Sequence, residues 1–426
     1  MLFFIIIYPL ETIKCRNKNG GKFAFFFNLC YITENIIYYN KKKRKLNDLM
    51  GKILLTGVTG LVGSAFVVAL LREKPTERFV CLVRSNGGGT AEERAAKVLR
   101  EQCEFDGCPE FADKVLEAVE VIDGDVVDIV PEELAKLDML KDVDRVFHCA
   151  ADVNLGKDPT GKTFKINYTG TVNMVKLSQL LKVKELHYVS TAYVAGKISG
   201  RAMEEQALDS GFNNPYEESK FKAEMLVRNS GIPFSVYRPA IITGRLSDGR
   251  VRRPLAFYVI VQFLAKLKQN RCVKMGLNPA DWVDMGLHFR AAASERVYFV
   301  PIDYVQQAIT KLFQKPVCNR TYHCTGNSPV QTYQIQRAIC NALKISNVEI
   351  SIDDNGAESA ESNLMSKFLG DLLPYFASNI TFDQRNITDA LGKDFVDWEF
   401  GEQGLEKIVR AFINDFMPDS VWAEKK

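Results

Sequence analysis

The sequence predicts an α/β protein with a doubly wound parallel sheet of the Rossmann type, followed by a smaller C-terminal α/β domain. Three observations lead to this fold class. Short apolar runs alternate with helical runs from residue 52 to residue 237, as in successive βαβ units. A glycine-rich turn, Gly57-Val58-Thr59-Gly60-Leu61-Val62-Gly63, separates the first strand from the first helix, where such sheets carry it. The chain of 426 residues is long enough for more than one domain.

The expected elements follow one another along the first half. Strands are expected at 52–56, 79–83, 119–122, 145–150, 186–191 and 234–237, and helices at 61–72, 91–102, 131–137, 164–181 and 216–228. Ligands of parallel sheets bind beyond the carboxyl ends of the strands, so we expect the residues after each strand to meet in one crevice. The expected domains are 50–243 and 244–426, the second partly interleaved with the sheet. The apolar run 255–266 in the second domain predicts a buried helix.

Composition excludes several classes of protein. The hydrophobic share of 46% and charged share of 25% are those of an ordinary soluble protein. A net charge of +3 implies no face for nucleic acid. The ten cysteines contain no CxxC pair and lie apart from the four histidines, which argues against a metal site and a disulfide framework. We therefore expect a cytoplasmic protein without metal.

Residues 1–49 differ in composition from the rest of the chain. Phe, Ile, Tyr, Asn and Lys, which share A/T-rich codons, make up over half of them. The favoured interpretation is upstream sequence translated from an early start codon, with the domain beginning at Met50. A membrane anchor or targeting peptide is the alternative, although the apolar runs are shorter than the roughly 20 residues that span a bilayer. Membrane contact, through the basic run 41–45, is expected only if this segment is real.

The glycine turn indicates a dinucleotide site. Glycines allow a tight turn and let backbone N–H groups approach a pyrophosphate at the helix N-terminus. The spacing is GxxGxxG, whereas many dinucleotide dehydrogenases have GxGxxG. A tight turn without a ligand is the alternative.

The end of the second expected strand indicates which cofactor binds. NAD sites place an acidic residue there, and NADP sites place an arginine nearby. This chain has Val83-Arg84-Ser85, in which Arg84 suits a 2′-phosphate and Ser85 can donate to it. The predicted cofactor is therefore NADP(H), and a solvated surface arginine is the alternative. Asp125, after the third strand, is expected either to accept from the adenine amino group or to act as a cap or turn residue.

Tyr216 and Lys220 lie four residues apart in an expected helix. Side chains at this spacing share one helix face. A phenol has an unperturbed pKa near ~10, and an ammonium beside it favours the phenolate and brings the proton within working range. The pair predicts a proton-delivery device, although this spacing on its own usually means a solvated helix face.

Several motifs together resemble the extended short-chain dehydrogenases/reductases. They are the glycine turn, Gly124-Asp125-Val126, His148-Cys149-Ala150-Ala151, the run from Val189 to Gly196, and YxxxK at Tyr216. Within that family the chain is similar to the male-sterility or thioester-reductase branch, which includes fatty acyl reductases and the reductase domains of carboxylic acid reductases and non-ribosomal peptide synthetases. LVR at 82–84, AEER at 91–94, ADVN at 151–154, STAYVAG at 190–196 and VPIDYV at 300–305 point to that branch. The resemblance covers roughly residues 52–313.

The resemblance implies a role for each matching residue. Tyr216 is the general acid/base, Lys220 lowers its pKa and holds the nicotinamide ribose, and Thr191 hydrogen-bonds the reacting carbonyl oxygen. His148 is expected beneath the cofactor and Tyr193 in the pocket wall, neither of them as an acid or base. The expected cofactor-binding residues are Gly57, Thr59, Gly60, Leu61, Val62, Gly63, Arg84, Asp125, Val126, Ala150, Ala151, Asn167, Tyr216, Lys220 and Pro239.

The resemblance implies an NADPH-dependent reductase of an acyl thioester or related carbonyl, giving an aldehyde or alcohol. Coenzyme A or a separate acyl carrier protein is expected to present the acyl group, and a homodimer is the assembly considered. One alternative is a nucleotide-sugar epimerase or dehydratase, or a hydroxysteroid-type dehydrogenase, on the same scaffold. A catalytically silent NADP-sensing protein is another, which the presence of both Tyr216 and Lys220 disfavours.

Overall fold

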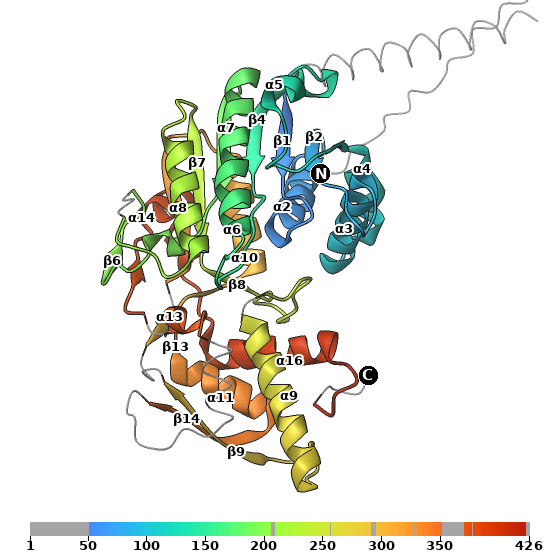
Figure 1. Cartoon of the computed structure of the whole chain (residues 1–426). Coiled ribbons are helices and arrows are strands. Elements are labelled where there is room, and N and C mark those ends of the chain that lie inside the picture. Colours follow the sequence, from blue (N-terminus) through green and yellow to red (C-terminus); the bar gives the residue numbers. More distant parts are fainter. Residues whose placement is uncertain are drawn as a thin grey trace, which may run out of the picture. The chain divides into compact units, whose positions relative to one another are not determined.

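The computed structural model describes residues 51–205, 209–255, 257–290, 295–327, 329–351, 370–376 and 378–422 (Figure 1). The chain divides after Met50 into two units, and the second, Gly51–Lys426, contains every described element. The expected leader at 1–49 lies outside the described residues. No helix in the described ranges is both long enough and apolar enough to cross a membrane.

The predicted parallel sheet is confirmed. It has seven strands in the order β12-β7-β5-β4-β1-β2-β3, and all neighbouring strands are parallel. The strands are β1 (Lys52–Thr56), β2 (Phe79–Val83), β3 (Val119–Asp123), β4 (Val143–His148), β5 (Glu185–Val189), β7 (Phe234–Pro239) and β12 (Arg320–Cys324). The strand order reverses between β1 and β4, where ligands of such sheets bind. The last strand, β12, comes from the second half of the chain.

Helices cover both faces of the sheet. Alternate strand residues point to opposite faces, so Leu54 packs in one buried cluster and Leu55 in another. The first cluster includes residues of α7 (Gly170–Leu181) and α8 (Pro215–Arg228), and the second includes residues of α2 (Leu61–Glu73) and α10 (Ile302–Phe313). The described cysteines are free thiols.

Two expected helices differ from the structure. The helix expected at 131–137 is α5 (Pro131–Leu134), and a 3₁₀ turn follows at Asp138–Leu140. The helix expected at 164–181 is interrupted: α6 (Lys162–Phe164) leads into the π-helical turn η3 (Lys165–Thr169), and α7 follows. Such turns are frequent at functional sites.

Helix α8 has a well-defined start. The Asn214 side chain accepts from the Glu217 backbone N–H at 3.0 Å, and Pro215 occupies the first helical position. An Asn cap followed by Pro is a strong helix-start signal. This start fixes the rotation of α8, and therefore which of its side chains face the sheet.

The second half adds a smaller group of helices and strands. It includes α9 (Phe257–Met275), β9 (Val283–Arg290) paired in parallel with β14 (Ile345–Ser351), α11 (Thr332–Leu343) and α16 (Gly401–Phe416). The buried helix expected at 255–266 begins at Phe257 as α9 and continues to Met275. Figure 1 shows this group beyond the end of the sheet at which β8 (Ile241–Thr243) lies.

Candidate active site

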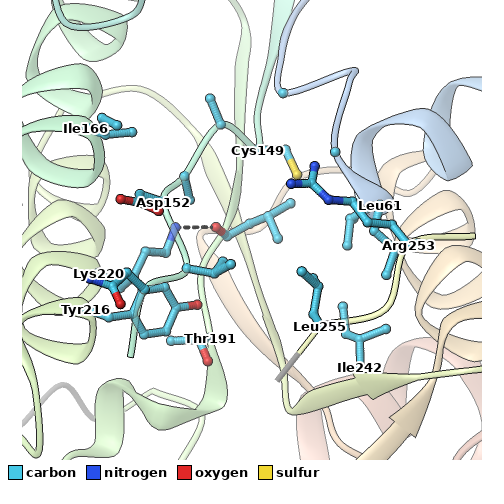
Figure 2. A pocket seen from close by; sticks show the side chains of 18 of the residues that line it. Leu61, Cys149, Asp152, Ile166, Thr191, Tyr216, Lys220, Ile242, Arg253 and Leu255 are labelled. Atoms are coloured by element: carbon cyan, nitrogen blue, oxygen red, sulfur yellow. Dashed lines mark hydrogen bonds between the residues drawn. The ribbon is translucent and has the colours of Figure 1, made fainter. Parts of the chain in front are cut away.

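A cavity of about 820 Å³ lies at the carboxyl edge of the sheet (Figure 2). Residues that follow β1, β2, β3, β4, β5 and β7 line it, as expected for a crevice at the strand ends. The structure brings together in this lining fourteen of the sixteen residues predicted for the site: Gly57, Thr59, Gly60, Leu61, Val62, Arg84, Asp125, Val126, Ala150, Ala151, Thr191, Tyr216, Lys220 and Pro239. Gly63 and Asn167 are not among the lining residues.

The glycines of the turn are required by close packing. Gly57 has φ +82°, and a Cβ there would lie 2.7 Å from the Ala150 backbone nitrogen. A Cβ at Gly63 would lie 2.3 Å from the Gly57 carbonyl oxygen. Gly63 therefore lets helix α2 pack against the turn, which is a different role from the expected contact with the pyrophosphate. Gly57 keeps the turn close to the segment after β4.

Asn167 is buried in the π-helical turn and connects two parts of the site. Its amide oxygen accepts from the Asp152 N–H at 2.8 Å, and its amide nitrogen donates to the Asp152 carbonyl oxygen at 3.0 Å and to Ser219 Oγ at 2.9 Å. Ser219 directly precedes Lys220 in α8. Asn167 thus holds the segment after β4 against the helix that carries Tyr216 and Lys220.

Lys220 is buried beneath the cavity. Its Nζ donates to the Val189 carbonyl oxygen at 2.7 Å and lies 4.2 Å from the centre of the Tyr188 ring. Figure 2 shows the bond to Val189 as a dashed line. Burial lowers the pKa of Lys220 to about 8, because removal from water disfavours the charged form.

Lys220 is not among the groups that shift the pKa of Tyr216 in this structure, and the expected lowering of that pKa by Lys220 stays a prediction. Burial raises the pKa of Tyr216 to about 12, and a hydrogen bond with Thr191 offsets only part of that rise. The ammonium of Lys220 is held by the carbonyl of Val189, so it does not counter the loss of solvent around the phenol. Tyr216 is therefore protonated at neutral pH, which is the form that can donate a proton.

Thr191 begins a short 3₁₀ turn directly after β5. Its Oγ1 accepts from the Tyr193 N–H at 3.3 Å and donates to the Pro239 carbonyl oxygen at 3.5 Å. These bonds fix the hydroxyl between the ends of β5 and β7. Tyr216 and Thr191 therefore present two hydroxyl groups to one region of the cavity (Figure 2).

The part of the cavity that is lined by the residues after β2 and β3 is basic. Arg84 Nη1 donates to Asp125 Oδ2 at 3.0 Å, and Asp125 Oδ1 accepts from the Val127 N–H at 3.1 Å. Asp125 is thus a turn residue, one of the two roles expected for it. Ser85 binds Asp123 through its N–H at 2.8 Å and its hydroxyl at 2.6 Å, so in this structure its hydroxyl donates to a protein carboxylate.

Two residues at this basic end had no expected role. Arg94 and Asn86 both line the cavity, and the Arg94 guanidinium donates to the Arg84 carbonyl oxygen. Arg94 belongs to the AEER motif at 91–94. The direction of the Arg94 side chain depends on where α3 (Ala91–Phe105) starts. Thr90 and Glu93 fix that start by forming a reciprocal capping box. A Thr-x-x-Glu signal at 90–93 was therefore available in the sequence.

His148 is a buried, hydrogen-bonded residue at the end of β4, and Tyr193 lies in the cavity wall. His148 Nδ1 lies 2.6 Å from Thr56 Oγ1, and its Nε2 lies 2.9 Å from Thr171 Oγ1. Burial lowers the pKa of His148 to about 3, so it is a neutral packed residue. Tyr193 lines the cavity and packs edge-on against Tyr375, with ring centres 4.7 Å apart.

The opposite end of the cavity is apolar. Its walls come from the segment before α9, from α9 itself, and from residues near 299 and 375, and include Ile242, Leu255, Phe257, Val259, Phe299, Leu372 and Phe376. Most of these had no expected role because they come from distant parts of the second half.

Within the described ranges, no group of three or more potential metal-ligand residues lies together.

One family model and several curated proteins match this chain. The family model described as "Male sterility protein" matches residues 55–309. The nonribosomal peptide synthetase asaC of Aspergillus flavus is 26% identical over 308 residues, covering 69% of this chain and 28% of that protein. A carboxylic acid reductase of Segniliparus rugosus is 27% identical over 285 residues, covering 61% of this chain and 23% of that protein. The chain thus spans about a quarter of the length of these relatives.

The fold also matches solved structures. The terminal R domain from the myxalamid PKS-NRPS biosynthetic pathway superposes with a TM-score of 0.63 at 23% identity, covering 85% of this chain and 91% of that chain. At this identity the likeness concerns the fold.

Proposed function

The chain belongs to the male sterility protein family, and we propose that it is an NADPH-dependent reductase of an acyl thioester or a related carbonyl, yielding an aldehyde or alcohol. The observation that carries this proposal is the meeting of Thr191, Tyr216 and Lys220 in one cavity with the glycine turn. The relatives support the substrate class, because their names denote a nonribosomal peptide synthetase and a carboxylic acid reductase. An acyl group carried by coenzyme A or by a separate carrier protein is consistent with the names of both relatives.

The cavity fits a nicotinamide dinucleotide. Helix α2 begins at Leu61 after the N-cap residue Gly60, with no side chain capping its N-terminus and no acidic residue in its first turn, which leaves backbone N–H groups for a pyrophosphate. A Cβ at Gly57 would collide with the segment after β4, so the chain keeps this approach open. Arg84 and Arg94 stand at the end where a 2′-phosphate would bind.

Reduction requires one hydride and one proton. When bound, the cofactor supplies the hydride to the carbonyl carbon. Thr191 and Tyr216 then hydrogen-bond the oxygen as it becomes an oxyanion, and the Tyr216 hydroxyl donates its proton. With a thioester, the C–S bond of the resulting hemithioacetal breaks, so one acyl thioester, one NADPH and one proton give an aldehyde, a thiol and NADP⁺.

The apolar end of the cavity supports an acyl substrate. Leu255, Phe257 and Phe376 line that end, and apolar walls hold an alkyl chain by removing it from water. A nucleotide sugar would place hydroxyl groups against the same walls, at a cost for each polar group left without a partner.

Absorbance of the reduced nicotinamide tests the function directly. We expect the full chain to oxidise NADPH when an acyl-CoA or an aldehyde is added, with the aldehyde or alcohol found by mass spectrometry. UDP- and GDP-sugars serve as the comparison, and their products must be examined separately because an epimerase recycles its cofactor. Absence of oxidation with every acyl thioester and aldehyde would refute the proposed function.

Arg84→Ala is expected to reduce the preference for NADPH over NADH roughly tenfold, because a charge-assisted bond to the 2′-phosphate is lost. The measurement is the ratio of kcat/KM for the two cofactors. Arg84→Lys is the matched control, which retains the charge and should keep part of the preference. An unchanged ratio in Arg84→Ala would show that the 2′-phosphate is recognised elsewhere.

NADPH affinity is expected to fall as pH rises above about 8. Lys220 has a pKa of about 8 because it is buried, so its ammonium is present below that pH and is lost above it. The neutral amine no longer attracts the ribose hydroxyls and the phosphates. Fluorescence titration of NADPH across that range gives the affinity, and Lys220→Met should bind weakly at every pH without this step. A flat profile in the unaltered protein contradicts the assignment.

A further inference from the structure

Five cationic side chains line the cavity, and they differ in their partners. Arg84 binds Asp125, Arg94 binds the Arg84 carbonyl, and Lys220 binds the Val189 carbonyl. Within the described ranges, neither Arg253 nor Lys162 contacts a carboxylate or carbonyl acceptor. These two cations are therefore available to a ligand.

Arg253 is held near the glycine turn by its neighbour. Arg252 Nη2 donates to the Gly60 carbonyl oxygen and to Ser64 Oγ, both at 3.0 Å, and its Nε donates to Gln102 Oε1 at 3.0 Å. The segment between β8 and α9 is thereby fastened across the first turn of α2. The next residue, Arg253, lines the cavity at this place.

Figure 2 shows the Arg253 side chain beside Leu61, with its guanidinium extending toward Cys149. Leu61 is the first residue of α2, and Cys149 follows β4. The N-terminus of α2 carries partial positive charge, and the first turn of this helix has no acidic residue to balance it. The guanidinium and the helix N-terminus therefore make one positive region that faces the cavity.

We propose that Arg253 binds the pyrophosphate of the nicotinamide cofactor from the side opposite the glycine turn. This inference rests on the proposed function. A guanidinium forms two parallel bonds with phosphate oxygens, so Arg253 and the N–H groups of α2 grip the same anion from two sides. Leu255 and Phe257 follow Arg253 and line the apolar end.

The position of Arg253 favours the cofactor over an acyl-carrier phosphate. Arg252 binds the Gly60 carbonyl in the turn that begins the dinucleotide site, and Arg253 directly follows it in the chain. A pyrophosphate is also common to NADPH and NADH, so Arg253 should not discriminate between the two cofactors. Arg84, at the basic end of the cavity where the 2′-phosphate would bind, should discriminate between them.

Direct binding measurements test the inference. Arg253→Ala should weaken both NADPH and NADH about tenfold in fluorescence titrations, the loss expected for one charge-assisted contact. It should leave the affinity for 2′-AMP, which carries no 5′-phosphate, within about twofold in competition titrations. Arg250→Ala is the matched control and should change none of these affinities, because Arg250 lies on the same segment outside the cavity lining and pairs with Asp415 at 2.8 Å. Thermal unfolding of each variant checks that the fold is retained.

Two outcomes would overturn the inference. One is an unchanged NADPH affinity in Arg253→Ala. The other is a raised KM for acyl-CoA with the cofactor affinity intact, which would place Arg253 at the phosphate of the acyl carrier. If the unaltered protein itself binds neither NADPH nor NADH, the proposed function fails together with the inference, so the two failures are distinguishable.

Discussion

Tyr216→Phe is expected to lower turnover at least ~10²-fold while NADPH binding stays nearly unchanged. The substitution removes one hydroxyl and keeps the ring that packs in the cavity wall. Burial raises the pKa of Tyr216 to about 12, so this hydroxyl carries a proton at every pH at which the protein would be assayed. Without it, the oxyanion formed by hydride transfer keeps only the Thr191 hydroxyl and must take its proton from water.

Single-turnover kinetics with an acyl-CoA measure this effect, and NADPH fluorescence measures binding. Tyr193→Phe is the matched control, because Tyr193 also lines the cavity and has no lysine one turn further along. The control should retain turnover within a few-fold. Similar losses in both variants would mean that Tyr216 contributes packing, and near-normal turnover in Tyr216→Phe would refute the proton-donor assignment.

Strands, turns and site residues could be predicted from the sequence where local signals agree with tertiary structure. The three central residues of β1 and all five residues of β2 are apolar, as expected for strands buried on both faces of a parallel sheet. The glycine turn, Arg84 and the Tyr216–Lys220 spacing are each contained in one short segment. Their convergence follows from the rule that strand ends share one edge of the sheet.

Features that depend on distant contacts could not be predicted in the same way. The π-helical turn places Asn167 between Asp152 and Ser219, and helical periodicity in 164–181 contains no trace of those partners. Arg253 acquires its position only because Arg252 binds Gly60, 192 residues earlier in the chain. The bond from the Lys220 ammonium to the Val189 carbonyl could not be predicted either, because spacing gives proximity on a helix but not the direction of a side chain.

Glu224→Ala is expected to destabilise the fold by about 3–5 kcal/mol. Glu224 lies one turn beyond Lys220 in α8. Its Oε1 accepts from Arg238 Nη2 at 2.6 Å and from Arg228 Nε at 2.9 Å, and its Oε2 accepts from Arg238 Nε at 3.0 Å. The side chains of Glu224 and Arg238 are 1% and 2% exposed. Removing the carboxylate leaves the buried guanidinium of Arg238 without its counter-charge.

The same cluster predicts a dependence of stability on pH. Burial alone would raise the pKa of Glu224, but Arg238 and Arg228 together bring it down from the ordinary value of 4.5 to about 2. A carboxyl whose pKa is lower in the folded state stabilises the fold above its unfolded pKa. That contribution is therefore complete above pH 4.5 and is lost progressively as the pH falls toward about 2.

Urea denaturation at neutral pH and across the acidic range measures both effects. Glu218→Ala is the matched control, because Glu218 lies on the same helix and forms an ion pair with Lys222 at 2.6 Å, with side chains 41% and 44% exposed. That solvent-exposed pair should contribute no more than about 0.5 kcal/mol. A loss in Glu224→Ala as small as in Glu218→Ala would mean that Arg238 relaxes to other partners. A large loss that disappears toward pH 2 would assign the stability of α8, and hence the placement of Tyr216 and Lys220, to this buried charge cluster.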